Sequence, residues 1–257
     1  MMKVVILAGG LGTRISEESH LRPKPMIEIG DKPILWHIMK YYSSFGFNEF
    51  IICAGYKQYV IKEYFADYFL HNSDVTFDLS NNGMIIHNNN SEQWKVSVID
   101  TGLHTMTGGR IKRIQKYIGA ERFMLTYGDG LCTVNLKELL DFHISHGRTA
   151  TITTVNISEM KGVLEVNDDG QITSFREKED RDASLINGGF MVFEPEIFNY
   201  LDDDTTVLEK SPLNRLSQEG QLMGFNHHGF WQCMDTQREK QKLEELWYSG
   251  KAPWKIW

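Results

Sequence analysis

Residues 4–14, near the start of the chain, have the sequence VVILAGGLGTR, and this stretch indicates the fold. The first four residues are apolar and three of them are β-branched, which is typical of a strand buried on both faces of a parallel sheet. Gly9, Gly10 and Gly12 come next. Glycine lets backbone N–H groups approach a bound group closely, and clustered N–H groups attract anions. The stretch therefore predicts an α/β protein with an anion-binding loop behind its first strand.

Two cations follow this loop and indicate that the anion is polyvalent. Arg14 stands directly behind the glycines, and Lys24 lies between Pro23 and Pro25. Proline fixes φ and stiffens the backbone, so Lys24 is held out from the chain. Neither the P-loop nor the dinucleotide-binding glycine motif fits this spacing. A turn that needs glycine only for tight geometry is the alternative, but the two rigid cations favour a clamp for a triphosphate.

The composition is that of an ordinary globular protein and limits its partners. Of 257 residues, 41% are hydrophobic and 24% are charged. The formal net charge of −7 argues against broad binding of nucleic acid or of an anionic membrane. No apolar run approaches the roughly 20 residues of a membrane-spanning helix, and we expect no signal peptide. Cys53, Cys132 and Cys233 are widely spaced, which predicts reduced, packed thiols in a cytoplasmic protein and no zinc site.

Apolar strands alternate with helical patterns in the first half of the chain. Strands are expected over 4–7, 50–54, 96–99 and 123–127, and helices over 59–69, 110–118, 136–146 and from Pro33 to a stop at Gly46. Such repeated units predict a parallel sheet with right-handed crossovers. The asparagine-rich segment 71–93 interrupts the alternation and is expected to form a polar hairpin or excursion.

The second half has a different pattern. Segments 163–166 and 171–175 flank an Asn-Asp-Asp-Gly turn and predict a β-hairpin. A strand is expected over 190–193, and helices over 195–201, 207–218 and 239–247. No linker-like segment separates the halves, so we expect a single domain over 1–257 with a smaller hairpin lobe.

Two aspartates are candidate metal ligands. Asp129 lies between two glycines at the expected end of a core strand, where open α/β sheets bind ligands. Mg²⁺ takes one or two protein carboxylates and completes its shell with phosphate oxygens and water, and Asp235 is the best candidate for the second. Alternatively, Asp129 is an ordinary turn residue and Asp235 is a helix N-cap near Glu239. The phosphate loop favours the metal site for both.

Another polar group follows the predicted hairpin. Glu177 and Asn187 carry a carboxylate and an amide, which suit sugar hydroxyls, and Lys178 suits a separate phosphate. The alternative is a solvated charge run, because residues 176–182 are nearly all charged. Four histidines lack companion ligands and are expected on the surface or in packing: His143, His146, His227 and His228.

These motifs resemble those of the sugar-1-phosphate nucleotidylyltransferases. The resemblance is carried by LAGGLGTR (7–14), PKP (23–25) and GD (128–129). It is stronger for the cytidylyl branch of that family, where it extends through residues 34–40, 106–110, 186–190, 229–232 and 250–255. Essentially the whole chain is covered. Two stretches depart from the family pattern: Glu179 stands in place of a proline, and Met160-Lys161-Gly162 in place of an arginine-aromatic-glycine run.

The resemblance implies a Rossmann-like nucleotidyltransferase fold with a mostly parallel central sheet and a smaller β-hairpin lobe on the sugar side. Residues 1–150 would mainly bind the nucleotide, and residues 151–257 the sugar phosphate. The implied reaction converts CTP and glucose 1-phosphate to CDP-glucose and pyrophosphate, with Mg²⁺ on Asp129 and Asp235. Its product would serve the deoxysugars of a surface polysaccharide such as lipopolysaccharide O-antigen. A homo-oligomer, often a hexamer, is also implied.

The same resemblance assigns the site residues. It places the catalytic charges on Arg14, Lys24 and Asp129. It places the sugar phosphate at Glu177, Lys178, Asn187 and Gly188. The nucleotide is expected at Leu7, Ala8, Gly9, Gly10, Leu11, Gly12, Thr13, Arg14, Lys24, Thr105, Gly109, Arg110 and Gly128. We expect in-line attack of the sugar phosphate on the α-phosphorus without a protein nucleophile, so that catalysis is positioning plus charge neutralisation.

Three alternatives stay open from the sequence. A uridylyl- or thymidylyltransferase is the first, because cytosine differs from uracil at one exocyclic group that backbone atoms can read. A hexose 1-phosphate other than glucose is the second. A non-catalytic nucleotide-sugar sensor is the third, and the intact set of Arg14, Lys24, Asp129 and Asp235 argues against it.

Overall fold

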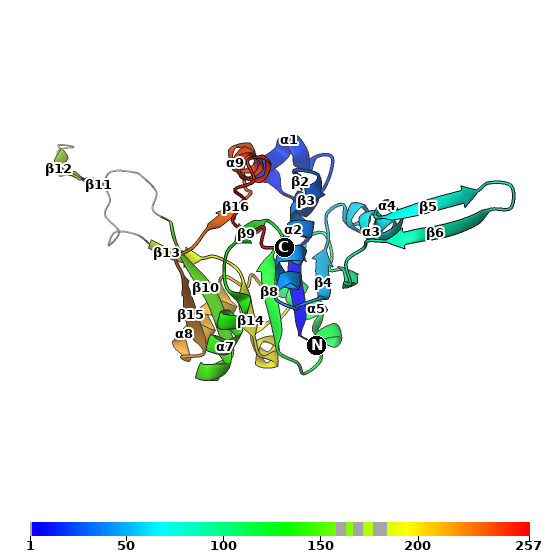
Figure 1. Ribbon diagram of the computed structural model, residues 1–257. Coiled ribbons are helices and arrows are strands. Elements are labelled where there is room, and N and C mark those ends of the chain that lie inside the picture. The colour runs from blue at the N-terminus through cyan, green and yellow to red at the C-terminus, as the bar shows by residue number, and fades with distance from the viewer. Residues whose placement is uncertain (1, 158–162, 167–171, 177–183) are drawn as a thin grey trace.

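A mixed eight-stranded β-sheet forms the centre of the protein (Figure 1). The computed structural model describes residues 2–157, 163–166, 172–176 and 184–257. Strand β1 (Lys3–Ala8) pairs in parallel with β4 (Glu49–Ala54) on one side and with β8 (Phe123–Tyr127) on the other. Strand β7 (Lys95–Asp100) is parallel to β4. These are the four strands predicted for the first half of the chain, and that prediction is confirmed.

The other half of the sheet contains both strand orientations. Strand β14 (Met191–Phe193) is antiparallel to β8 and to β10 (Ala150–Ile157). Strand β10 also pairs antiparallel with β13 (Ser184–Asn187) and parallel with β15 (Leu222–His227). The predicted α/β class is therefore confirmed, with a sheet that is mixed and only partly parallel.

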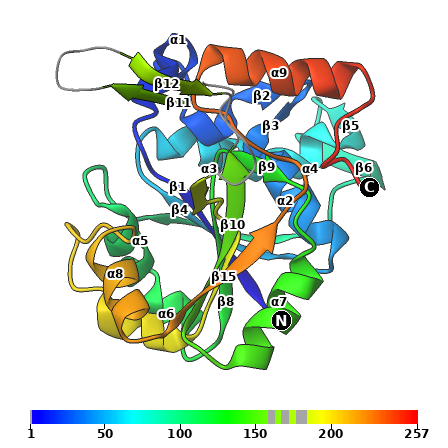
Figure 2. The same ribbon diagram turned by 90° about the vertical axis from the view of Figure 1, so that its left-hand side faces the viewer.

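Helices cover both faces of the sheet because its central strands are apolar at successive positions. In β1, Val4 and Ile6 join the hydrophobic cluster on one face, and Val5 and Leu7 join the cluster on the other. The result is three layers (Figure 2). The first face packs against α2 (Ile34–Ser44), α3 (Gln58–Ala66) and α7 (Leu136–His146), and the second against α5 (Thr107–Arg113), α6 (Gln115–Ile118), η4 (Pro195–Tyr200) and α8 (Ser211–Gln218).

The predicted helices are present, but several boundaries differ. The helix expected over 110–118 is two short helices, α5 and α6, which meet at Ile114. The one expected over 59–69 divides into α3 and α4 (Tyr68–His71). The helix expected over 195–201 is the 3-10 helix η4, which ends at Tyr200. Helix α8 begins only at Ser211, because Pro212 lacks an N–H and suits a first helical turn.

Short elements follow the glycine loop before α2 begins. They are η1 (Thr13–Ile15), α1 (Ser16–Ser19), η2 (Lys24–Met26), β2 (Glu28–Ile29) and β3 (Lys32–Pro33), and β2 pairs antiparallel with β3. Pro33 was expected inside the first turn of α2. It lies in β3 instead, and the helix starts directly behind it.

The chain changes direction along the sheet between β1 and β8. From β1 it passes through α2 to β4 and then to β7, and it returns through α5 and α6 to β8 on the opposite side of β1. The loops that leave the carboxyl ends of β1 and β8 therefore diverge, which opens a crevice between them. The glycine-rich loop and Asp129 both stand at this point.

A short ribbon outside the main sheet joins two remote parts of the chain. Strand β9 (Gly130–Cys132) pairs antiparallel with β16 (Trp231–Cys233), and Cys233 lies opposite Gly130. Helix α9 (Gln237–Tyr248) follows close to its predicted place. The sequence did not predict either short strand.

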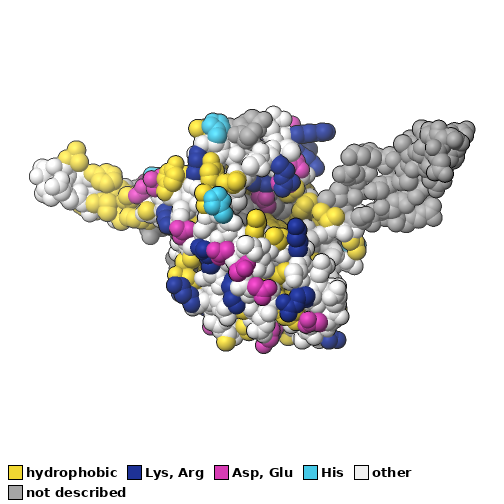
Figure 3. All heavy atoms as spheres, turned by 180° about the vertical axis from the view of Figure 1, so that it is seen from behind, with side chains coloured by type: hydrophobic (Ala, Val, Ile, Leu, Met, Phe, Trp, Pro, Cys, Tyr) yellow, Lys and Arg dark blue, Asp and Glu magenta, His cyan; other side chains and the backbone are white. Residues whose placement is uncertain are grey.

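Two β-hairpins project from opposite ends of the molecule (Figure 1). Strands β5 (Ser73–Asp78) and β6 (Gly83–Asn89) form the hairpin predicted within 71–93. Strands β11 (Val163–Val166) and β12 (Ile172–Arg176) form the predicted hairpin of the second half. Figure 3 shows apolar side chains along the first hairpin, where Phe77, Leu79, Met84, Ile85 and Ile86 are exposed.

The cysteines and histidines are placed as predicted. Cys53 and Cys132 are buried free thiols, and Cys233 is a half-buried one. His143 is fully buried and bonds the Thr151 hydroxyl at 2.8 Å, which makes it a packing residue. Within the ranges that the structure describes, no helix combines the length and hydropathy needed to cross a membrane.

Candidate active site

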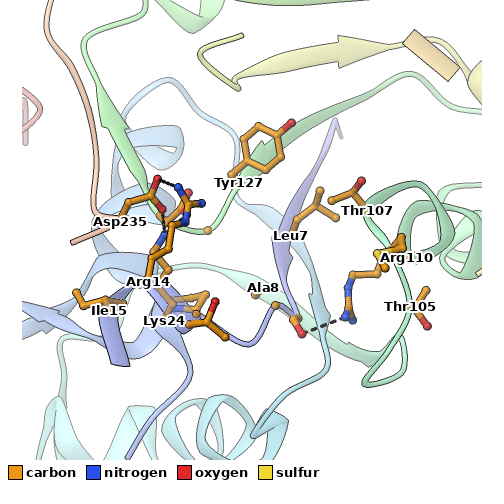
Figure 4. A pocket seen from close by; sticks show the side chains of 18 residues that line it. Leu7, Ala8, Arg14, Ile15, Lys24, Thr105, Thr107, Arg110, Tyr127 and Asp235 are labelled. Carbon is orange, nitrogen blue, oxygen red and sulfur yellow. Dashed lines mark hydrogen bonds and ion pairs between the residues drawn. The ribbon is translucent and has the colours of Figure 1, made fainter. Parts of the chain in front are cut away.

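A cavity of about 380 Å³ opens at the carboxyl ends of β1 and β8 (Figure 4). Arg14, Lys24 and Asp235 lie on one side of it, and Thr105, Thr107 and Arg110 on the other. Loops from separate parts of the chain therefore meet in one hollow. Its lining comprises Leu7, Ala8, Gly9, Gly10, Gly12, Thr13, Arg14, Ile15, Lys24, Pro25, Thr105, Met106, Thr107, Arg110, Tyr127, Gly128, Asp129 and Asp235.

Arg110 fixes the glycine-rich loop from behind. The residue is only 5% exposed, and its guanidinium donates to the carbonyl oxygens of Gly9 at 3.0 Å and Gly102 at 2.7 Å. It also donates to the Thr101 hydroxyl at 2.8 Å. A Cβ at Gly9 would lie 2.0 Å from Arg110 Nη1, so glycine is required at this close approach. Arg110 thus holds the loop behind β1 against the loop behind β7.

The proline-flanked turn presents Lys24 to the cavity. In η2, the Met26 N–H donates to the Pro23 carbonyl oxygen at 2.8 Å, which closes the turn around Lys24. Gly128 approaches this turn so closely that a Cβ there would lie 2.9 Å from Pro25. The Lys24 side chain is 11% exposed. The turn therefore directs a mostly buried lysine toward the end of β8.

The Lys24 ammonium lies between the two candidate metal ligands. Its nitrogen is 2.5 Å from Asp129 Oδ2 and also contacts Asp235 Oδ1. Arg14 Nη1 lies 2.6 Å from Asp235 Oδ2. Burial alone would lower the pKa of Lys24, but the two carboxylates outweigh it and raise that pKa above its usual value. The structure thus brings four residues singled out from the sequence into one charged cluster.

The β9–β16 ribbon is what brings Asp129 and Asp235 together. The Met234 N–H donates to the Asp129 carbonyl oxygen at 2.8 Å, which adds a hydrogen bond beyond the paired strands. Thr236, and not Asp235, is the N-cap of α9, and Glu239 completes a capping box with it. The carboxylate of Asp235 is therefore available to the cluster, and the alternative reading as a helix cap is wrong.

The donor set of this cluster fits Mg²⁺. The carboxylates of Asp129 and Asp235 already enclose one cationic group, the Lys24 ammonium, and both residues line the cavity. Mg²⁺ requires only one or two protein carboxylates, because phosphate oxygens and water complete its shell. In the described part of the chain, no group of three or more His, Cys, Asp or Glu residues is arranged to hold a metal. A metal here would therefore depend on the substrate for further ligands.

Two residues predicted at the nucleotide do not line the cavity. Gly109 lies in α5, where its N–H donates to the Thr206 carbonyl oxygen at 3.1 Å and a Cβ would come within 2.7 Å of Asp204 Cα. Its close approach serves the packing of α5. Leu11 is 48% exposed within the loop. Thr105, by contrast, lines the cavity and is buried. Nucleotide contact at each of these positions stays a prediction.

The predicted sugar side is described only in part. Glu177, Lys178, Glu179 and the stretch 160–162 lie outside the described residues. Asn187 ends β13, and its Nδ2 donates to the hydroxyl of Tyr127 at 3.2 Å. The Gly188 carbonyl oxygen accepts from Trp231 Nε1 at 2.7 Å. Neither Asn187 nor Gly188 lines the cavity, but Asn187 contacts Tyr127, which does.

Sequence reasoning missed several lining residues. Tyr127 had an available signal, since it directly precedes Gly128 and Asp129 at the carboxyl end of a core strand. Thr107 also had a signal, since it lies between Thr105 and Arg110, which were both predicted at the nucleotide. The residues missed are Ile15, Pro25, Met106, Thr107 and Tyr127.

Several known proteins are similar to this chain in sequence or in structure. Residues 3–232 match the nucleotidyl transferase family. Over the full length of both chains, the protein is 54% identical to a glucose-1-phosphate cytidylyltransferase of Salmonella typhimurium and 44% identical to a probable glucose-1-phosphate cytidylyltransferase of Bacillus subtilis. The crystal structure of HddC from Yersinia pseudotuberculosis is similar with a TM-score of 0.70 and 27% identity, over 96% of this chain and 100% of that one.

Proposed function

Because the chain belongs to the nucleotidyl transferase family, we propose that it acts as a glucose-1-phosphate cytidylyltransferase. It transfers the cytidylyl group of CTP to glucose 1-phosphate and releases CDP-glucose and pyrophosphate. The structural observation that carries this proposal is the ammonium of Lys24 held between Asp129 and Asp235 beside the glycine-rich loop. Such a cluster suits two phosphorylated substrates that repel one another until cations neutralise them. The two full-length relatives support the choice of CTP and glucose 1-phosphate.

The nucleotide phosphates bind against the glycine-rich loop and its cations in this proposal. Arg14 is 73% exposed, so its side chain can follow the departing pyrophosphate. Lys24 is fixed in its turn and faces the end of β8, which suits the phosphate that undergoes reaction. Arg110 supports the loop from behind through the Gly9 carbonyl oxygen.

The reaction is a direct in-line displacement. An oxygen of the sugar phosphate attacks the α-phosphorus of CTP, a new phosphorus–oxygen bond forms, and the bond to the pyrophosphate oxygen breaks. Asp129 and Asp235 would hold Mg²⁺, which when bound supplies positive charge to the phosphate oxygens. Lys24 can exchange a carboxylate partner for an oxygen of the bound phosphates, where its charge is needed. Catalysis is thus positioning and charge neutralisation.

Glucose 1-phosphate binds on the Asn187 side of the cavity in the same proposal. Asn187 reaches Tyr127, which lies two residues before Asp129. We extend the proposal to Glu177 and Lys178 as partners of the sugar and its phosphate, and to Gly188 beside them.

The proposal also includes the assembly of the protein and the use of its product. By resemblance the protein forms a homo-oligomer, a hexamer, and its product is used for surface polysaccharide. Sedimentation velocity of the purified protein tests the oligomer.

Pyrophosphate release tests the proposed reaction. The purified protein is supplied with Mg²⁺, glucose 1-phosphate and one of CTP, UTP, dTTP or ATP, and we expect rapid release with CTP alone. The Lys24→Ala variant, purified in the same way, reports any contaminating activity. Preference for UTP or dTTP would support the mechanism but contradict the proposed specificity for cytosine. If no nucleotide and no hexose 1-phosphate gives pyrophosphate release but CTP binding is measurable, the protein would be a nucleotide-sugar sensor.

A further inference from the structure

Glu209 joins two residues that line the cavity, although it does not line the cavity itself. Its Oε1 accepts the hydroxyl of Tyr127 at 2.6 Å, and its Oε2 accepts the hydroxyl of Thr107 at 2.6 Å. Tyr127 is the last residue of β8, and Thr107 is the first residue of α5. One carboxylate therefore fastens the end of β8 to the start of α5. Figure 4 shows both of these hydroxyl-bearing side chains.

The Thr107 hydroxyl is itself fixed in this arrangement. It accepts the backbone N–H of Leu208 at 2.9 Å and donates to Glu209. Thr105, a predicted nucleotide residue, lies two positions before it and lines the same cavity. The Thr107 hydroxyl therefore holds the second oxygen of the Glu209 carboxylate in a fixed position.

The Tyr127 hydroxyl determines how Asn187 is oriented. An ionised carboxylate can only accept hydrogen bonds, so the single hydroxyl hydrogen of Tyr127 goes to Glu209. The Tyr127 oxygen is left as an acceptor, and Asn187 presents its Nδ2 group to it at 3.2 Å. Asn187 Oδ1 then accepts the N–H of Gly189 at 2.9 Å.

We propose that Glu209 is a positioning residue for glucose 1-phosphate. Through Tyr127 it fixes the orientation in which the Asn187 amide meets the hexose, while its bond to Thr107 keeps the carboxylate itself in place. This inference rests on the proposed function, in which Asn187 contacts the sugar. Without Glu209, the Tyr127 hydroxyl can donate to Asn187, and only Gly189 opposes rotation of the amide.

A role in stability alone would leave a different signature. Glu209 is exposed, and exposed polar contacts contribute little to the free energy of unfolding. Its removal should therefore leave the fold intact and change only substrate affinity. Glu219 offers a matched control, because it is also an exposed carboxylate and accepts a tyrosine hydroxyl, that of Tyr200, at 2.5 Å without lining the cavity.

The test compares KM and kcat for both substrates in Glu209→Ala, Glu209→Gln, Tyr127→Phe and Glu219→Ala, together with the thermal unfolding midpoint. In Glu209→Ala we expect KM for glucose 1-phosphate to rise roughly tenfold, the scale of one hydrogen bond to a charged group, and KM for CTP to change less than about twofold. Glu209→Gln keeps one acceptor oxygen and should restore part of the affinity. Tyr127→Phe should match Glu209→Ala, and Glu219→Ala should match the wild type.

Two results for the Glu209→Ala variant would overturn the inference. Unchanged KM for glucose 1-phosphate in Glu209→Ala would remove Glu209 from the sugar side, even though wild-type turnover upholds the proposed function. An equal rise in both KM values with a lowered unfolding midpoint would show a structural role. If the wild type prefers another nucleotide or hexose 1-phosphate, the same comparison is made with that pair. If the wild type turns over no pair of nucleotide and hexose 1-phosphate, the proposed function is wrong, and this inference is wrong with it.

Discussion

The ammonium nitrogen of Lys24 lies 2.5 Å from Asp129 Oδ2, within the space that a cation bound to that carboxylate would take. The same ammonium contacts Asp235, so a lysine and a divalent cation have the same two partners. A metal bound between these two carboxylates would therefore compete with the ammonium for them. Phosphate offers the lysine an alternative partner, which links metal entry to nucleotide binding.

Replacing Lys24 by methionine should therefore strengthen metal binding in the absence of nucleotide. The variant leaves two carboxylates facing each other without their ammonium, and we expect the Kd for Mn²⁺ to fall by roughly tenfold. Isothermal titration calorimetry or electron paramagnetic resonance of Mn²⁺ measures this Kd without any turnover. Lys40→Met is the matched control, since Lys40 pairs with Glu92 at 3.1 Å elsewhere and should leave Mn²⁺ affinity unchanged. Equal or weaker Mn²⁺ binding in Lys24→Met would contradict the competition.

Removing any one charge of the cluster should greatly slow turnover. We expect Arg14→Ala, Lys24→Ala and Asp129→Ala each to lower kcat by about 10²- to 10³-fold, the usual cost of losing one group that stabilises transition-state charge. Steady-state pyrophosphate release at saturating substrates measures the loss. Lys95→Ala serves as the control, because Lys95 pairs with Glu49 on the surface with 76% of its side chain exposed. Near-normal turnover in one of the three variants would exclude that residue from the catalytic set.

Neighbouring glycines in the loop should respond differently to alanine. Gly9→Ala forces a Cβ against Arg110, which cannot move aside without breaking its bonds to Gly9 and Gly102, and should destabilise the fold by about 1–3 kcal/mol. Gly10 has open space around it but lines the cavity, so Gly10→Ala should keep the unfolding midpoint and raise KM for CTP. Thermal unfolding and KM for CTP separate the two effects. A stable Gly9→Ala with normal KM would refute the bracing role of Arg110.

His37 should make the protein less stable as the pH falls below neutrality. The residue is fully buried; its Nε2 donates to the Ile29 carbonyl oxygen at 2.8 Å, and its Nδ1 accepts from Trp254 Nε1 at 3.4 Å. An indole can only donate, so the ring has no place for a second proton. Burial lowers the pKa of His37 to about 4, against about 6.5 in the unfolded chain. Between those values the unfolded state binds more protons, and stability decreases as pH falls.

Urea unfolding followed by circular dichroism across pH 7.5 to 4.5 measures this effect. We expect His37 to contribute a loss of about 1.4 kcal/mol per pH unit below pH 6.5, or about 3 kcal/mol in all. In His37→Gln, the slope of the free energy of unfolding against pH should be smaller by the contribution of about one bound proton. His87→Gln, at an exposed position of β6, should retain the wild-type dependence. An identical dependence in His37→Gln and the wild type would show that His37 does not carry the proton.

The local pattern was sufficient for the centre of the fold and for the phosphate loop. Every position of VVIL in β1 is apolar because helices cover both faces of the sheet, and this constraint is visible in one short stretch. Pro23 and Pro25 restrict their own backbone, so the presentation of Lys24 could also be predicted locally. The break between α5 and α6 at Ile114 could not, because no proline or glycine marks it.

The sequence by itself thus determined the residue types of the site: a glycine loop, two cations and two aspartates. Only the tertiary structure decided which of them meet. Asp129 and Asp235 are joined by a ribbon of three residues on each strand, too short to leave a periodic signal. Glu209 meets Tyr127 and Thr107 because separate loops converge beside the cavity. Such contacts depend on the pairing of remote segments, which burial and backbone hydrogen bonding settle across the whole chain and which no local pattern records.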